Sequence, residues 1–246
     1  MRYEEYTIEG RNAVLEAFRA GKTIDKLYVQ NGCHDGAVNS ITREARKRDT
    51  IITYVAKERL DQMSSTGKHQ GVIAQAAAYE YAEMEEIFDK AEEQGEPPFL
   101  FLLDEIEDPH NLGAIIRTAN LAGAHGVIIP KRRAAGLTAT VVKASAGALN
   151  YTPVVKVTNL AQTIDELKER GLWFVCADME GEIMYHQDLT GPIGLVIGNE
   201  GQGVSRLVRE KCDYVASIPM KGNIDSLNAS VAAGVLAYEI VRQRMS

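Results

Sequence analysis

Three short stretches in the second half of the sequence carry the residues best suited to bind and orient a ligand. Each joins a hydrophobic run to a polar turn that bears Gly or Asn, and then to a segment with helical character. In a sheet of parallel strands, such turns at strand ends are the usual place for a ligand site. The stretches are Asn111 to Ala119, Ile197 to Gly203, and Ile218 to Met220 running into Ser226 to Ser230.

The second stretch is a glycine-rich turn, with Gly198, Gly201 and Gly203 between a predicted strand and a predicted helix. Glycine lets the main chain approach a ligand closely, and Glu200 stands at the end of the strand. The spacing is GxxGxG rather than GxGxxG, and no acidic residue closes a second strand about twenty residues later. A conventional dinucleotide site is therefore disfavoured.

Other common chemistries lack their residues here. The sequence has no GxSxG elbow and no HExxH helix, and its five His are scattered, which argues against hydrolases and zinc enzymes. The acidic turn Asp104 to Asp108 offers oxygen ligands, but acids before a helix more often form a solvated flank, so we predict no metal. The polar stretch Ser64 to Gly71 does not match a P-loop, which leaves a solvated turn and a phosphate-contacting loop as alternatives.

The elements that position these stretches alternate along the chain. Phe99 to Leu103 is a continuous apolar run, typical of a strand buried on both faces. Further strands are predicted at 127–130, 154–157, 172–177, 193–198 and 214–218, and helices at 111–122, 138–148, 160–170, 204–209 and 226–244. This alternation predicts an α/β fold with a parallel sheet and helices on both faces.

The first part of the chain predicts a second, smaller α/β domain. Its helices are expected at 11–20 and 37–48, and its strands at 26–30, 51–55 and 71–79. Between the two parts, Tyr81, Met84 and Phe88 recur at helical spacing among many acids. We therefore predict domains at residues 1–79 and 99–246, joined by a solvated acidic linker helix within 80–98.

The composition is that of an ordinary soluble protein, with 246 residues, 45% hydrophobic and 25% charged. No apolar leader or run of roughly 18 apolar residues is present, so we expect a cytoplasmic protein without a membrane partner. The three Cys are far apart and are expected to be reduced. The acidic excess behind the net charge of −7 lies in residues 80–98, which leaves near-neutral domains on which basic patches can bind phosphate.

Together the three stretches resemble motifs one, two and three of the SpoU (TrmH) family, RNA ribose 2′-O-methyltransferases of the SPOUT class. Their order, spacing and strand-turn-helix context agree over residues 99–246. The stretch Ile8 to Val14 is similar to the small substrate-binding domain of the RlmB-like branch. The matched residues are Asn111-Leu112-Gly113 with Arg117, Gly198-Asn199-Glu200-Gly201 with Gly203, and Ile218-Pro219-Met220 with Ser226-Leu227-Asn228-Ala229-Ser230.

The resemblance implies a C-terminal α/β knot, a parallel sheet with a deep trefoil knot, and an N-terminal L30e-like α/β domain that binds the RNA substrate. Knots are very rare, so this expectation rests on the family alone. In the family, S-adenosylmethionine lies bent in a cleft between motifs two and three, with adenine held largely by main-chain groups. The matching cofactor positions are Gly198, Ile218 and Leu227, with Asn199 and Met220 nearby.

The family chemistry is an in-line attack by a ribose 2′-hydroxyl on the sulfonium methyl group. A hydroxyl is a weak nucleophile near neutral pH, so the site must orient it and relieve it of its proton. The resemblance places Arg117 near that hydroxyl, but a guanidinium is effectively always protonated, so we expect a clamp on phosphate and ribose rather than a base. Asn111, Glu200, Ser226 and Asn228 complete the set, and Asn111 and Ser226 also occupy positions typical of N-caps.

Further basic residues are candidate RNA contacts. Lys131, Arg132 and Arg133 follow a predicted strand end, Lys143 lies among small residues, and Lys68 lies in the polar stretch of the first domain. Aromatic residues are few, so recognition is expected to use shape and flipped-out nucleotides rather than a stacking platform.

We therefore expect an RlmB-like, S-adenosylmethionine-dependent methyltransferase that acts on a guanosine of 23S ribosomal RNA. The helix at 226–244 bears more apolar residues than one packed face needs, and it is expected to line a homodimer interface, which the family uses to complete its active site. The alternatives are 2′-O-methylation of transfer RNA, resistance-type methylation of ribosomal RNA, or a non-catalytic ribosome-assembly factor of the same fold.

Overall fold

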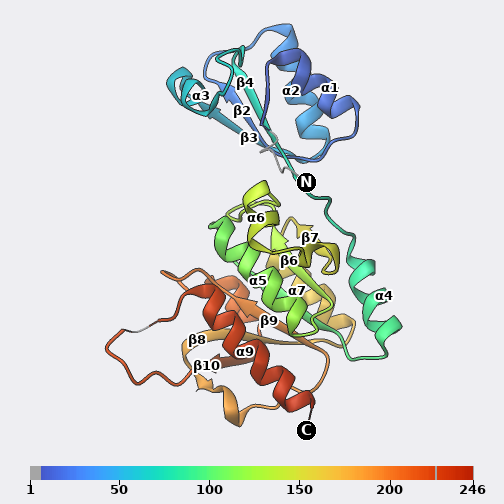
Figure 1. Ribbon diagram of the computed structural model, residues 1–246, viewed down its shortest axis with the longest axis vertical. Helices are drawn as coiled ribbons and strands as arrows, with labels where there is room; N and C mark the ends of the chain where they lie inside the picture. The colour runs from blue at the N-terminus through green and yellow to red at the C-terminus, as the bar shows by residue number, and fades with distance from the viewer. Residues whose placement is uncertain (1–6, 225, 246) are drawn as a thin grey trace. The chain divides into compact units, whose positions relative to one another are not determined.

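The computed structural model describes residues 7–224 and 226–245 (Figure 1). The chain forms two units, one of Met1–Glu80 with Gly136–Ala139, the other of Tyr81–Ala135 with Thr140–Ser246. Within the described ranges, no helix is long and apolar enough to cross a membrane.

The first unit is built on a four-stranded sheet in the order β1-β4-β2-β3. Strands β2 and β3 are parallel, and β4 is antiparallel to both β1 and β2. Phe18, Leu27 and Ile41 join two helices and the sheet in one core. The elements are β1 (Thr7–Glu9), α1 (Arg11–Arg19), β2 (Ile24–Gln30), α2 (Gly36–Lys47), β3 (Ile51–Val55), α3 (Lys57–Met63) and β4 (Val72–Ala76).

The second unit contains a six-stranded sheet in the order β10-β8-β9-β5-β6-β7, and all its strand pairs are parallel. All five residues of β5 are buried, as expected for a central strand. The α/β fold with a parallel sheet is thus confirmed, while the trefoil knot stays a prediction. The strands are β5 (Phe99–Leu103), β6 (Gly126–Pro130), β7 (Val154–Val157), β8 (Trp173–Ile183), β9 (Ile193–Ile197) and β10 (Tyr214–Ser217).

Helices cover both faces of this sheet. Leu100 and Leu102 lie in a buried cluster with side chains of α4 (Met84–Gln94), α7 (Leu160–Glu169) and α8 (Arg206–Lys211). Because side chains alternate along a strand, Phe99, Phe101 and Leu103 point to the other face. There α5 (Pro109–Leu121) and α9 (Ala229–Arg244) pack against each other (Figure 1).

The acidic segment forms the expected helix, α4, but this helix is not a solvated linker. Ile87 and Ala91 are buried, and Ile87 belongs to the core of the second unit. Arg170, the C-cap of α7, stacks on the Phe88 ring and pairs with Glu85, 3.0 Å away. The acidic residues occupy the exposed face of α4. They dominate the composition of the segment, so the sequence does not indicate that its apolar residues are buried.

The helix expected at 138–148 is shorter and broken. α6 (Ala139–Ala144) ends early, and Gly147, with φ +91°, leads into the 3-10 turn η1 (Ala148–Asn150). A side chain on Gly113 of α5 would overlap Ala144. The glycine of the first motif therefore permits close packing of α5 against α6.

Candidate active site

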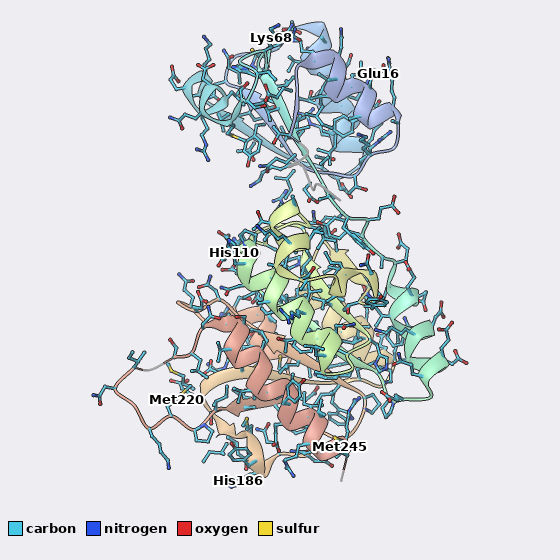
Figure 2. All side chains as sticks on the ribbon, viewed as in Figure 1. Glu16, Lys68, His110, His186, Met220 and Met245 are labelled. Carbon is cyan, nitrogen blue, oxygen red and sulfur yellow. The ribbon has the colours of Figure 1, made fainter. Side chains whose placement is uncertain are left out.

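The second and third sequence motifs line one cavity of about 230 Å³ at the carboxyl edge of the second sheet, and the first motif joins them through a hydrogen bond from Asn111 to Glu200. The carboxyl ends of parallel strands share one edge, so β9 and β10 bring distant segments together. All five predicted cofactor positions line this cavity: Gly198, Asn199, Ile218, Met220 and Leu227. Met220 lies in the long connection between β10 and α9 (Figure 2).

The glycine turn after β9 is held in a tight, specific shape. Asn199 and Gly203 exchange two main-chain hydrogen bonds of 3.1 and 2.7 Å, and the Gly201 amide donates to Asn199 Oδ1 at 2.8 Å. A Cβ on Gly198 would overlap the main chain of Gly203 and Val204. Position 198 therefore requires glycine because the chain's own turn packs against it, whereas close approach of this backbone to a ligand stays a prediction.

Glu200 joins the three motifs through one carboxylate oxygen. Its Oε1 accepts hydrogen bonds from Asn111 Nδ2 at 2.9 Å, from Ala229 N at 3.2 Å, and from Asn228 Nδ2. Asn228 Nδ2 also lies 3.0 Å from Asn111 Oδ1. Glu200 Oε2 has no hydrogen-bond partner in the described ranges, which leaves an acceptor at the mouth of the cavity.

The helix caps differ from those expected. Ser226 lines the cavity but does not cap α9; Asn228 is the N-cap, and its Oδ1 accepts from Ser230 N at 3.0 Å and Val231 N at 3.4 Å. Asn111 does not cap α5 either, because Asp108 holds that position. Asn111 therefore has its side chain free to bond Glu200.

The structure does not bring Arg117 to the cavity. Arg117 is exposed on α5, and its side chain makes no hydrogen bond or ion pair with the described part of the chain. It lies six residues after Asn111, which corresponds to about 9 Å along a helix axis. Asn111, Glu200, Ser226 and Asn228 thus gather at one site, and Arg117 does not join them within one chain.

The fold and these motifs place the protein among known relatives. Residues 98–238 match the SpoU rRNA Methylase family, and residues 7–82 match the family described as RNA 2′-O ribose methyltransferase substrate binding. The chain belongs to the SpoU rRNA methylase family. It is 52% identical over 241 residues to YacO of Bacillus subtilis, assigned to the TrmH family of tRNA/rRNA methyltransferases, and the match covers 98% of this chain and 96% of YacO.

Solved SpoU structures share the architecture. AviRb of Streptomyces viridochromogenes, a SpoU methyltransferase crystallised with AdoMet, aligns with a TM-score of 0.62 and 29% identity over 98% of this chain and 90% of its own. A TrmH/SpoU tRNA-modifying enzyme of A. aeolicus aligns with a TM-score of 0.56 and 33% identity over 61% of this chain and 77% of its own. This SpoU protein is therefore an RNA methyltransferase of the TrmH/SpoU family with an N-terminal substrate-binding domain. The exact domain limits stay a prediction.

The predicted RNA contacts of this SpoU protein fall in both units. Lys131, Arg132 and Arg133 follow β6, and Arg133 pairs with Glu105 at 2.7 Å, which raises the pKa of the guanidinium. Lys143 is exposed in α6. Lys68 lies in the first unit, on the loop between α3 and β4 (Figure 2).

The partly buried carboxylate of Glu9 orders the loop that carries Lys68. The Glu9 side chain accepts hydrogen bonds from Ser64, Ser65 and Thr66, including the Ser65 amide at 2.7 Å. Partial burial raises the pKa of Glu9, but these hydrogen bonds outweigh that effect and lower it to about 2. The stretch is therefore an ordered loop rather than a loose turn.

Some residues at or next to the cavity belong to none of the three motifs. Asp104, expected in a solvated flank, is buried with 6% exposure, and its Oδ2 accepts from Ser205 N at 2.8 Å. Ala177 to Met179 of β8 also line the cavity. Their position at the end of a predicted strand was the available signal. Among the described residues, no group of three or more His, Cys, Asp and Glu side chains is arranged to hold a metal ion.

Proposed function

We propose that the protein transfers a methyl group from S-adenosylmethionine to the ribose 2′-hydroxyl of a guanosine in 23S ribosomal RNA, and so contributes to ribosome maturation. The observation that carries this proposal is the cavity lined by motifs two and three, in which Glu200 also accepts a hydrogen bond from Asn111 of motif one. The relatives named above support an RNA substrate.

The groups that line the cavity suit S-adenosylmethionine. Ile218 and Leu227 provide apolar walls for an aromatic base. The main-chain groups of Met220 and Leu227 make no hydrogen bonds within the described ranges, so they are available to the edge of adenine. When bound, S-adenosylmethionine supplies an electrophilic methyl group.

The residues around Glu200 then act on the ribose. The hydrogen bonds on Oε1 fix the carboxylate, and the unpartnered Oε2 accepts the hydrogen of the 2′-hydroxyl. Asn111 of α5 and Asn228, the N-cap of α9, hold this geometry. Orientation of a weak nucleophile and removal of its proton are the two tasks that this reaction requires.

Arg117 completes the site from a second copy of the chain. Helices α5 and α9 pack on each other and expose large apolar side chains: Leu121 at 64%, Val231 at 49% and Tyr238 at 51%. Such a surface favours a symmetric dimer. In that dimer, the exposed guanidinium of Arg117 reaches the partner's cavity and clamps the phosphate and ribose.

The choice of ribosomal over transfer RNA rests on the first unit. The substrate-binding match covers residues 7–82, whereas the A. aeolicus tRNA-modifying enzyme aligns with only 61% of the chain. An additional RNA-binding domain suits a large folded substrate.

Mapping of 2′-O-methyl groups at nucleotide resolution tests this function. Ribosomal and transfer RNA are compared between cells with the protein, without it, and with the Glu200→Gln variant. We expect one guanosine of 23S RNA to lose its methyl group in the last two. Loss of a transfer RNA methyl group instead identifies the alternative substrate, and restoration of ribosome assembly by Glu200→Gln without methylation identifies an assembly factor.

A further inference from the structure

A buried carboxylate lies directly beneath the glycine turn of the cavity. Asp104 follows the last residue of β5 and is 6% exposed. Its amide donates to Ile197 O at 2.8 Å, and its Oδ2 accepts from Ser205 N at 2.8 Å. Asp104 therefore contacts the chain just before the glycine turn and again just after it.

The next residue binds the middle of the same segment. The Glu105 carbonyl accepts from Asn199 Nδ2 at 3.3 Å, and Asn199 in turn orders the turn through its bonds with Gly201 and Gly203. Glu105 has φ +59°, a left-handed conformation that costs a non-glycine residue about 1 kcal/mol. A strained backbone at this point persists because the surrounding contacts determine it.

These contacts reach the turn from outside the cavity. Asn199 and Gly203 line the cavity, whereas Asp104 and Glu105 do not. A hydrogen bond from a backbone amide to an ionised carboxylate is stronger than one between neutral groups, and its loss leaves a buried partner unsatisfied. The pairing of β5 ends at Leu102 against β6 and at Leu103 against β9, so the bond between the Asp104 carboxylate and Ser205 shapes the turn rather than the sheet.

We propose that Asp104 is a positioning residue for methyl transfer. Acting through Ser205, and supported by the Glu105 contact to Asn199, it holds the turn from Gly198 to Gly203 in the shape that binds the methyl donor. The inference rests on the proposed function, because it assigns the donor to this cavity.

The first test compares Asp104→Ala with Asp104→Asn by calorimetric titration of S-adenosylhomocysteine and S-adenosylmethionine. The Ala variant loses the acceptor for Ser205 N, and we expect its affinity to fall about tenfold or more. The Asn variant keeps an acceptor oxygen, so it recovers most of that loss. In steady-state assays the Ala variant raises KM for the donor more than it lowers kcat, and KM for RNA stays unchanged.

A second variant removes the other partner of the bond. Ser205 has φ −59°, which proline adopts, so Ser205→Pro deletes the amide hydrogen at a compatible main-chain angle. We expect a similar loss of donor affinity, and little further loss when Asp104→Ala is added, because both changes remove one interaction. Additive losses overturn the proposed pairing.

A stability control separates positioning from loss of fold. Val155 is buried in β7, at the opposite edge of the sheet from β10, and Val155→Ala lowers stability without touching the turn. Its donor affinity should match that of the unaltered protein. Equal affinity of Asp104→Ala and the unaltered protein overturns the inference, as does an equal loss in Val155→Ala. Absence of donor binding by the unaltered protein instead overturns the proposed function.

Discussion

Glu200 presents two carboxylate oxygens with different surroundings. Oε1 is occupied by Asn111, Asn228 and the Ala229 amide, whereas Oε2 has no partner in the described ranges. In Glu200→Gln, one oxygen still orients the amides but an amide nitrogen replaces the second acceptor. We expect single-turnover methyl transfer to slow about 100-fold or more, with donor affinity nearly unchanged. An unchanged rate contradicts a role for Oε2.

Gly198 allows a second residue-scale prediction, because a side chain there has no room. Gly198→Val places carbon atoms against the main chain of Gly203 and Val204, so we expect calorimetric binding of S-adenosylmethionine to disappear. Gly201→Ala is the matched control in the same turn. Its Cβ lies 3.4 Å from Asn199 Oδ1, and it should bind the donor within about threefold of the unaltered protein.

The residues of the site that the sequence predicts are those that belong to motifs. Gly198 and Glu200 stand out because glycine spacing and a carboxylate at a strand end are local features. Asp104 does not stand out, since burial depends on what packs above it, and consecutive acids before a helix have the pattern of a solvated flank. The sequence predicts Ser226 as the cap of α9, but Asn228 is the N-cap, because local spacing does not reveal where the loop ends and the helix begins.

At the scale of elements, the loop after β6 links the expected RNA contacts to the donor cavity. Arg132 and Arg133 are both exposed, but Arg133 pairs with Glu105. Arg132→Ala should weaken RNA binding and reduce its salt dependence by about one counterion, with no effect on the donor. Arg133→Ala should also weaken donor binding, by about two- to fivefold, because an exposed ion pair contributes only a small stabilisation.

Filter binding of RNA at several salt concentrations and calorimetry of the donor distinguish these two variants. Identical donor affinities of Arg132→Ala and Arg133→Ala contradict the link through Glu105.

Helices and strands with a strong hydrophobic pattern are predicted well. Short elements, and helices whose apolar residues lie among many acids, are not. The five apolar residues of β5 give the central strand directly. α3 buries only Leu60 and leaves no periodic signal, and β1 has three residues. The many acids of α4 predict a solvated helix, whereas Ile87 lies in the core. Burial of its apolar residues is set by the neighbouring helix and sheet rather than by the segment itself.

At the scale of the whole molecule, His125 makes stability depend on pH. Its ring is fully buried, and Nδ1 accepts from Phe99 N at 2.9 Å. Burial, and then the charge of Lys90, lower the pKa of His125 from 6.5 to about 4, while Glu96 opposes this shift and Arg244 adds a smaller lowering effect. Between pH 4 and pH 6.5, His125 binds more protons in the unfolded chain than in the folded protein. The free energy of unfolding therefore falls as pH drops from 6.5 to 4, by about 3 kcal/mol.

Urea unfolding between about pH 5 and 7.5 measures this dependence in the upper part of its window, above the range in which Glu9 titrates. His125→Asn keeps an acceptor for Phe99 N but does not titrate. We expect a flatter stability profile for this variant. If the free energy of unfolding depends equally on pH in the unaltered protein and in His125→Asn, the pH dependence belongs to other groups.

The proposed dimer gives the final prediction, which asks whether Arg117 acts within its own chain or across the interface. Arg117 lies on α5 away from the cavity, so Arg117→Ala and Glu200→Gln should each inactivate their own homodimer. When the two variants are mixed and allowed to exchange subunits, one site of each heterodimer combines an intact Glu200 with the partner's intact Arg117. Random assortment then restores about a quarter of the full activity. If Arg117 serves its own chain, no site in the mixture has both groups and activity stays absent. Sedimentation of each variant shows whether it still dimerises, so an inactive mixture of intact dimers contradicts action across the interface.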